Sequence, residues 1–258
     1  MRILAGCLLL IVSVAASAQE AERILRCMRG NVPTALRVHR FQLSHADAEG
    51  RTRNVAGRFF QMREESPSGR MLVHMMIRVD APADLQGASY LARQEESAGA
   101  VQESLYVYLP AAHQVTRIGG ETADGAFLGT SFTYRDLLQL ANGFAGSNAT
   151  IENDGQAYER PTRILRFTGD GQRSARVWID EKSCMPLKAD YYEGTALRRQ
   201  LTTPDFALTD SAKTGWYLQE IDLNDVRDGA STVLKIVGAD KPKALPREYF
   251  DPAKFFRN

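Results

Sequence analysis

The sequence has little of what local catalytic and metal-binding signatures require. Its 258 residues include three cysteines and four histidines. No His-Glu-x-x-His motif, nucleophile elbow or glycine-rich phosphate loop occurs in it. His39, His45, His74 and His113 have no second ligand at metal spacing. These absences argue against a metal site and against the common hydrolase and nucleotide-binding classes, and they predict a protein without a cofactor.

Long apolar runs are confined to the first residues. A basic residue follows the initiating Met, residues 3–14 are apolar, and residues 16–18 are small. This order is typical of a secretory signal peptide cleaved after Ala18, and the run is too short for a membrane span. A lipoprotein acylation box at Cys7 is the alternative, but the apolar run follows that cysteine instead of preceding it. We expect an exported, periplasmic protein with a signal peptide at 1–18 and a single domain at 19–258.

An excess of charge is also missing. After residues 1–18 the chain retains 31 basic and 31 acidic side chains. Nucleic-acid binders normally carry a basic excess or a basic stripe. The balance argues against nucleic acid as a partner.

Two cysteines, Cys27 and Cys184, remain after the predicted cleavage. In an oxidising compartment such a pair either forms a disulfide or stays as two buried thiols. A bridge requires the two Cα atoms to lie within about 7 Å, a distance that sequence does not specify. Both alternatives therefore stay open at this point.

The apolar pattern predicts a sheet with few helices. A short helix is expected at 20–29, another at 134–141 and a third around Asp84, while most of the remaining chain alternates with period two. Tight turns separate most of the strand-like runs. These runs are residues 36–43, 71–79, 101–109, 115–118, 163–167, 176–179, 187–192, 197–201, 216–221 and 232–237. The pattern predicts a mainly β (α+β) protein in which a strongly bent antiparallel sheet holds short helices against its concave face.

Several of these strands are apolar on both faces, which a sheet with one solvated face would not require. On one interpretation the second face binds an apolar ligand, with Met71, Met75 and Met76 as adaptable lining. On the other, the methionines fill gaps in an ordinary core. Composition alone favours the second interpretation.

Five segments resemble, in order and spacing, the outer-membrane lipoprotein-sorting protein family, which is similar to the LolA-like lipoprotein-carrier superfamily. The resemblance extends from about residue 70 to the C-terminus. The segments are "VDAPADLQGASYL" at 79–91, "YVYLPAAHQVTRI" at 106–118, "GAFLGTSFTYRDL" at 125–137, "RVWIDEKSCMPLKADYYEGTALRR" at 176–199 and "LPREYFDPAKF" at 245–255. The chain departs from the family at Thr116, where a basic residue is usual, and at 138–150, where a glycine-rich apolar stretch replaces an acidic one.

The resemblance implies a sheet curled into an incomplete barrel, with short helices as a lid over a hydrophobic cavity. Such a cavity takes acyl chains of lipids or lipoproteins and needs no catalytic residue, so the chain is expected not to be an enzyme. It also implies transient membrane contact and an inner-membrane export transporter of the resistance-nodulation-division type as partner. A sensor that detects lipids or lipoproteins and signals through a protein partner is the alternative on the same fold.

The ligand-binding residues are assigned under this resemblance to three strands and the lid. The face of each strand is uncertain by one residue, and an error of one reverses it. The predicted lining is Met71, Val73, Met75, Ile77, Leu105, Val107, Phe127, Leu128, Phe132 and Trp178.

Phe127 and Leu128 stand out because they interrupt a polar, glycine-rich segment. The segment reads "GGETADGAFLGTSFTYRDLL" and spans 119–138. Gly125 and Gly129 flank the pair as hinges, and Thr133 is placed to cap the following helix. Either the pair dips into the cavity as part of a lid, or it only anchors a loop to the core.

Overall fold

The structure is a computed structural model, and it describes residues 4–66, 68–97, 100–144, 146–169, 171–204, 206–208, 216–240 and 247–257. Two α-helices, four short 3-10 helices and fifteen strands are found there. The helices are α1 (Leu4–Gly30), η1 (Pro110–Ala112), η2 (Gly120–Asp124), η3 (Phe127–Gly129), α2 (Tyr134–Asn142) and η4 (Arg247–Phe250). The strands are β1 (Arg37–Ala46), β2 (Thr52–Glu65), β3 (Met71–Ala81), β4 (Ser89–Ser97), β5 (Ala100–Leu109), β6 (Gln114–Ile118), β7 (Ala149–Ala157), β8 (Arg160–Thr168), β9 (Arg173–Asp180), β10 (Pro186–Glu193), β11 (Ala196–Thr202), β12 (Phe206–Leu208), β13 (Trp216–Leu218), β14 (Glu220–Asp225) and β15 (Ser231–Asp240).

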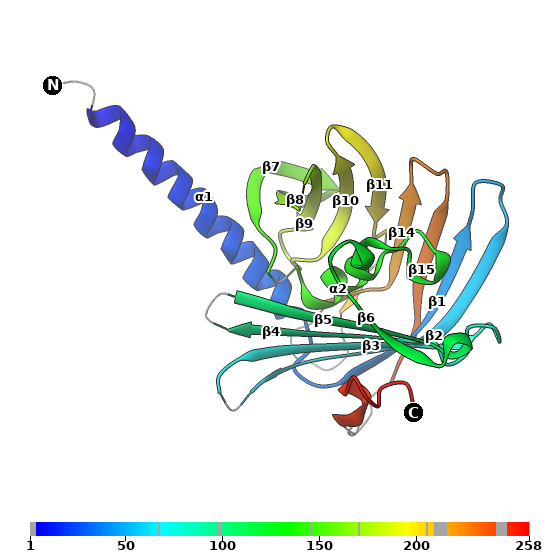
Figure 1. Ribbon diagram of the computed structural model, residues 1–258. Helices are drawn as coiled ribbons and strands as arrows, with labels where there is room; N and C mark the ends of the chain where they lie inside the picture. The colour runs from blue at the N-terminus through cyan, green and yellow to red at the C-terminus, as the bar shows by residue number, and fades with distance from the viewer. Residues whose placement is uncertain are drawn as a thin grey trace.

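Thirteen of the strands form one antiparallel sheet that curls without closing. Its order is β6-β5-β4-β3-β2-β1-β15-β14-β11-β10-β9-β8-β7, so β6 and β7 are the two edges. β12 and β13 pair separately. The curl is visible in Figure 1, where the two halves of the sheet face each other across α2. The predicted fold class, an incomplete barrel with short helices against the concave face, is confirmed.

The two edge strands are consecutive in the chain although they lie at opposite ends of the sheet. The connection between them, residues 119–148, must therefore cross the concave side. It carries η2, η3 and α2, and Figure 1 shows α2 inside the curve of the sheet. We call residues 119–144 the crossing segment. Its path follows from the strand order, because β6 and β7, which it connects, are the opposite edges of the sheet.

The main core lies between the concave face and the elements that the curl encloses. In β3, Met75, Ile77 and Val79 are buried on this face, as alternation along a strand requires. α2 contributes Leu137 and Leu138, and the other core helix is α1. At about 25 cal/mol per Å² of apolar surface removed from water, this layer supplies the main stabilisation of the curl.

The convex face of β2 to β5 is covered too, by the C-terminal segment 247–257. Phe250 and Phe255 are buried against Phe60, Met76 and other residues of the outer face. In Figure 1 this segment, drawn in red, lies beneath the sheet. The strands that are apolar on both faces are therefore explained by two cores, and Met75 and Met76 are core residues on opposite faces.

A disulfide joins Cys27 of α1 to Cys184, with a Cα–Cα distance of 5.8 Å. One of the two alternatives left open by the sequence is thereby found in the structure. Cys184 belongs to the turn between β9 and β10, so the bond fixes the end of α1 to the sheet.

α1 is longer than the helix predicted at 20–29, because the apolar run that precedes residue 20 is also helical and is continuous with it. Residues 17–19 are exposed, whereas burial begins at Ala21 and includes Ile24, Leu25 and Met28. The first part of α1 extends beyond the sheet in Figure 1. Within the described residues, no helix combines the length and apolarity that a membrane span needs.

The predicted strands are all found, but four observed strands are missing from the prediction. The longest of them is β2. Its adjacent residues Phe59 and Phe60 are both apolar, since Phe59 packs against the main core and Phe60 against the C-terminal segment. Two covered faces remove the period-two signal. The predicted third helix around Asp84 is wrong, since residues 83–87 form turns after the cis Ala81–Pro82 peptide.

Candidate functional site

An apolar cavity opens between the middle of the curled sheet and the elements enclosed by it. It has a volume of about 130 Å³ and is partly open to solvent. Its walls come from the end of α1, from β1, β2, β3, β14 and β15, from the crossing segment, from residues 184–186 and from β13. The cavity is therefore built from distant parts of the chain that only the fold brings together.

The floor of the cavity is the pair of central strands β1 and β15. Phe41 lies opposite Ile236 and Leu43 opposite Leu234, and all four side chains line the cavity. Leu234 and Ile236 are only partly buried, unlike the core residues beside them. Partial exposure of apolar side chains inside a curled sheet marks a surface available to an apolar ligand.

The crossing segment forms the opposite wall. Phe127 is 2% exposed and lines the cavity, together with Leu137 and Leu140 of α2. Leu128 has a left-handed backbone with φ of 51°, and Gly129 follows with φ of 76°. Gly129 thus needs the conformational freedom of glycine, so the structure supports a backbone bend after the apolar pair.

Gly125 differs from Gly129. Its φ is −68°, which any residue adopts, so the backbone conformation at Gly125 does not itself require glycine. Phe127 both lines the cavity and packs against Tyr90 and Tyr134, at ring-centroid distances of 6.1 and 5.6 Å. The position of Phe127 is therefore compatible with both interpretations, a lid over the cavity and an anchor to the core.

α2 begins where the sequence predicts. The Thr133 hydroxyl accepts a hydrogen bond from the Asp136 amide at 3.0 Å, and the Asp136 carboxylate accepts one from the Thr133 amide at 2.8 Å. This reciprocal cap satisfies two backbone donors at the helix start. The cap fixes the entry of α2 into the cavity wall.

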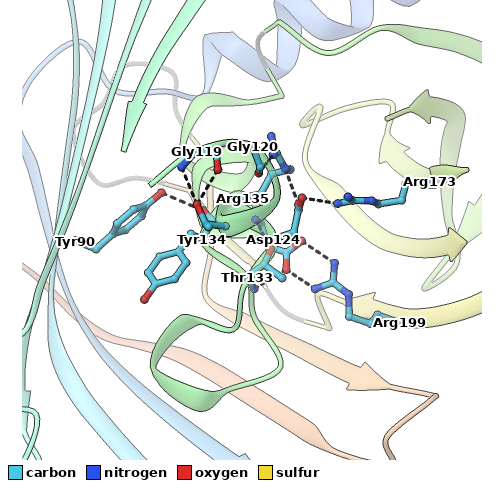
Figure 2. Close-up of polar contacts among 11 residues, drawn as sticks. Tyr90, Gly119, Gly120, Asp124, Thr133, Tyr134, Arg135, Arg173 and Arg199 are labelled. Carbon is cyan, nitrogen blue, oxygen red and sulfur yellow. Dashed lines mark hydrogen bonds and ion pairs between the residues drawn. The ribbon is translucent and has the colours of Figure 1, made fainter. Parts of the chain in front are cut away.

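Polar contacts hold the crossing segment to both halves of the sheet (Figure 2). Asp124 pairs with Arg135, at 2.7 Å from its Nε, and also with Arg173 of β9. Although burial opposes it, these two guanidinium groups lower the pKa of Asp124. On the other side the Tyr90 hydroxyl of β4 donates a hydrogen bond of 3.0 Å to the Tyr134 carbonyl. The segment is thereby tied across the opening.

The strongest of these attachments joins α2 to β11. The Arg199 guanidinium donates two hydrogen bonds to the Asp136 carboxylate, one of them 3.2 Å long between Nη2 and Oδ1. Asp136 is 3% exposed. Burial opposes the charge of Arg199, but the Asp136 carboxylate outweighs it and raises the Arg199 pKa. The pair is a buried ion pair, so each charge depends on the other.

Four polar side chains line the cavity. Asn31 donates to the Ser183 carbonyl at 2.8 Å and accepts from the Trp216 amide at 3.1 Å, while Gln61 donates to the Ala141 carbonyl. The other two are Arg37 and His39 of β1. Burial lowers the pKa of Arg37. Burial, and secondarily the charge of Arg37, lower the pKa of His39 to about 4.

His39 is therefore neutral near pH 7, and acid should destabilise the protein through it. Its folded pKa of about 4 lies below the ordinary 6.5, so the unfolded chain takes up the proton first as the pH falls. The stabilisation is complete above pH 6.5 and is lost towards pH 4, by about 3 kcal/mol. Equilibrium denaturation between pH 7.5 and 4 should show a smaller decline for His39→Phe than for the unchanged protein.

The matched control is His113→Asn. His113 is exposed and has a left-handed backbone, which Asn tolerates. Its pH dependence should follow that of the unchanged protein. Equal declines for all three proteins would contradict the assignment to His39.

The residues predicted to bind a ligand are only partly gathered at the cavity. Ile77 and Phe127 line it. Ile77, Val107, Phe127 and Leu128 line a second, smaller pocket that shares two of these residues with the first. Met75, Leu105 and Phe132 are buried in the core on the concave side. The face predicted for β3 and β5 is thus the concave one, but most of it is covered by the crossing segment.

Trp178 corrects the prediction, because it lies on the outer face of β9. Val177 beside it is fully buried in the main core, and successive residues of a strand face opposite sides. The Trp178 ring lies 4.4 Å from Lys188 Nζ and 5.4 Å from Arg176 Cζ. Met71 and Val73, which precede Met75 along β3, do not line the cavity either.

The sequence prediction missed the central strands as the cavity floor. In β1, alternate residues Arg37, His39, Phe41 and Leu43 line the cavity, and the period-two pattern there was the available signal. The prediction followed the methionines instead. The position of β1 and β15 in the middle of the sheet was not encoded in any local pattern.

Comparison with known proteins finds a matching family model and solved structures of similar fold. A family model described as an uncharacterized protein matches residues 72–257, more than half of the chain. No curated protein matches the sequence. A DUF1329 family protein from Desulfovibrio piger aligns with a TM-score of 0.79 and 19% identity, over 91% of this chain and 97% of that chain.

Two further structures share the fold. An outer membrane lipoprotein-sorting protein domain from Vibrio parahaemolyticus aligns with a TM-score of 0.79 and 19% identity, over 93% of this chain and 100% of that chain. A LolA superfamily protein from Nitrosomonas europaea aligns with a TM-score of 0.62 and 16% identity, over 90% and 97%. At these identities the similarity establishes a common fold.

Proposed function

Because this chain belongs to the family whose model matches residues 72–257 and has the LolA-like fold of lipoprotein-sorting proteins, we propose that it is a non-enzymatic periplasmic carrier of acyl chains. These acyl chains belong to lipids or lipoproteins, and the apolar cavity binds them for transfer towards the outer membrane. Residues 1–18 serve as the signal peptide and residues 19–258 as the single carrier domain. A resistance-nodulation-division type export transporter in the inner membrane is the proposed partner, with transient membrane contact.

The observation that carries this proposal is the partly open apolar cavity between β1, β15 and the crossing segment. Each methylene moved from water into such a site contributes about 0.8 kcal/mol. A chain of several methylenes is therefore held firmly without any chemical step. Across the part of the chain that the structure describes, no group of three or more potential metal ligands is present.

The cavity volume indicates how a ligand enters. The cavity measures about 130 Å³, which is less than the roughly 300–1,000 Å³ of sites that enclose drug-sized ligands. A bound acyl chain must therefore displace part of the wall. The wall elements outside the large sheet are the end of α1, residues 184–185, the crossing segment and β13. The disulfide holds the first two together, so we expect the cavity to widen at the crossing segment and β13.

Native purification from a cell envelope followed by mass spectrometry tests the proposal. We expect an acyl lipid or an acylated peptide to copurify with the protein, and the emptied protein to take up a fluorescent fatty acid. Reproducible absence of both would contradict a carrier function. Copurification of an inner-membrane signalling protein in place of a transporter would favour the sensor alternative.

Filling the cavity should weaken uptake without unfolding the protein. In Leu234→Trp the indole is placed between Phe41 and the crossing segment, where it displaces ligand. Excluding two methylenes corresponds to about 1.6 kcal/mol, or more than about tenfold in the dissociation constant of the fluorescent fatty acid.

Val237→Trp is the matched control for this variant. Val237 is on the same strand, on the opposite face, and 49% exposed. It adds the same bulk outside the cavity and should leave uptake unchanged. If the two variants bind the fatty acid equally well, the cavity is not the binding site.

A further inference from the structure

Two polar side chains of β1, those of Arg37 and His39, extend into the apolar cavity. His39 is 4% exposed, and its Nε2 has no partner. No hydrogen bond or ion pair joins Arg37 to the part of the chain that the structure describes; the guanidinium lies 6.0 Å from the Tyr217 ring centroid. Because both residues line the cavity with Phe41 and Leu43, they share the concave face of the strand.

The other polar groups of the cavity differ from this pair. Asn31 and Gln61 are engaged with backbone groups, as described above, so they have a structural role. An unpaired buried donor or acceptor is unfavourable by about 1–3 kcal/mol. His39 Nε2 is such an unpaired buried atom. Arg37 is half-buried and, unlike Asn31 and Gln61, has no hydrogen-bond partner among the described residues.

Arg37 also differs from the arginines around it. Arg40, on the outer face of the same strand, pairs with Asp240 at 2.6 Å. Arg199, inside the curl, pairs with Asp136. Arg37 is half-buried and has no counter-charge among the described residues. Withdrawing a cation partly from water in this way is unfavourable, and burial lowers its pKa. An anion bound beside Arg37 would therefore supply the counter-charge that its guanidinium lacks.

The arrangement along β1 has a direction. Arg37 and His39 are followed, on the same face, by Phe41 and Leu43. Arg37 and His39 are two residues apart, which corresponds to about 7 Å along a strand, and the Tyr217 ring lies beside both, 4.5 Å from the His39 ring. One end of the cavity is therefore polar and cationic, and the remainder is apolar.

We propose that Arg37 and His39 form a head-group subsite that binds the carboxylate or phosphate of an acidic acyl lipid whose chain lies along Phe41, Leu43, Leu234 and Ile236. The guanidinium donates to the anionic oxygens, and neutral His39 donates from Nε2 in the tautomer protonated there. The inference rests on the proposed function, and it narrows the cargo from acyl chains in general to anionic amphiphiles.

Displacement of the neutral dye Nile red by three ligands of equal chain length tests the subsite. The ligands are myristate, myristyl alcohol and myristoyl lysophosphatidate, and the proteins are the unchanged chain, Arg37→Met, Arg37→Lys and Arg40→Met. We expect myristate or the lysophosphatidate to bind about tenfold or more tighter than the alcohol, as charged hydrogen bonds imply. The tighter of the two anions identifies the head group.

The variants separate the subsite from general charge effects. Arg37→Met should lose the preference for the anion, Arg37→Lys should retain most of it, and Arg40→Met should keep it in full. The ligand-free melting temperature of Arg37→Met should not fall, because the variant removes a half-buried charge that has no ion-pair partner among the described residues.

The outcomes also distinguish this inference from the proposed function. Equal binding of all three ligands by the unchanged protein, or an unaltered preference in Arg37→Met, would overturn the subsite and leave the carrier function standing. Failure of every ligand and of the dye to bind would overturn both.

Discussion

Removal of the Cys27–Cys184 disulfide, by Cys27→Ser with Cys184→Ser, is expected to lower the free energy of unfolding by about 2–5 kcal/mol. The bond joins residues 157 positions apart, so it restricts the unfolded chain strongly. It also fixes the end of α1, whose Met28 lines the cavity beside Cys184. Urea denaturation of the oxidised protein and of the double variant measures the difference.

Reduction provides the internal control for this prediction. A thiol reductant should lower the denaturation midpoint of the unchanged protein towards that of the double variant, and it should leave the double variant unaffected. Identical midpoints for the oxidised protein and the double variant would show that the bond does not stabilise the fold. Weakened uptake of fatty acid by the double variant is expected as well, because one wall of the cavity loses its attachment.

Arg199→Met is expected to lower the free energy of unfolding by about 3–5 kcal/mol. The substitution leaves the Asp136 carboxylate, which is 3% exposed, without its counter-charge in the interior. It also detaches α2 from β11. Chemical denaturation measures the stability, and the dissociation rate of a bound fluorescent fatty acid should rise because the crossing segment is held less firmly.

Arg198→Met is the matched control on the neighbouring residue. Arg198 pairs with Glu193 at 2.9 Å on the opposite, solvent-exposed face. Exposed pairs of this kind contribute at most about 1 kcal/mol. Equal losses in the two variants would mean that burial of the Asp136–Arg199 pair is not what stabilises α2.

Alternation and turn composition were sufficient to predict the class of fold and most of the strands. These signals are local, since a strand with one covered face must alternate whatever its neighbours are. They failed at β2 and β7 for different reasons. β2 is covered on both faces, whereas the edge strand β7 carries mostly polar residues.

The candidate site was harder to predict than the fold. Phe127 was recognised because it interrupts a polar segment, and Ile77 because it belongs to an apolar strand. Trp178 was assigned to the wrong face because strand register has a period of two and a shift of one residue reverses the side chain. Alternation put Arg37 and His39 on the same face of β1 as Phe41 and Leu43, but no local signal marked that face as part of a cavity, since a polar residue at the start of a strand is ordinary.

Sequence by itself determined the elements: the alternating strands, the capped helix at Thr133 and a pair of cysteines available for bonding. These depend on interactions within a few residues, which are written in the order of the chain. Tertiary structure alone decided that β1 and β15 lie at the centre of the sheet, that residues 247–257 cover its convex face, and that Arg37 and His39 meet an apolar cavity. Those features depend on which distant strands pair and where the sheet bends, and both are set by packing of the whole chain.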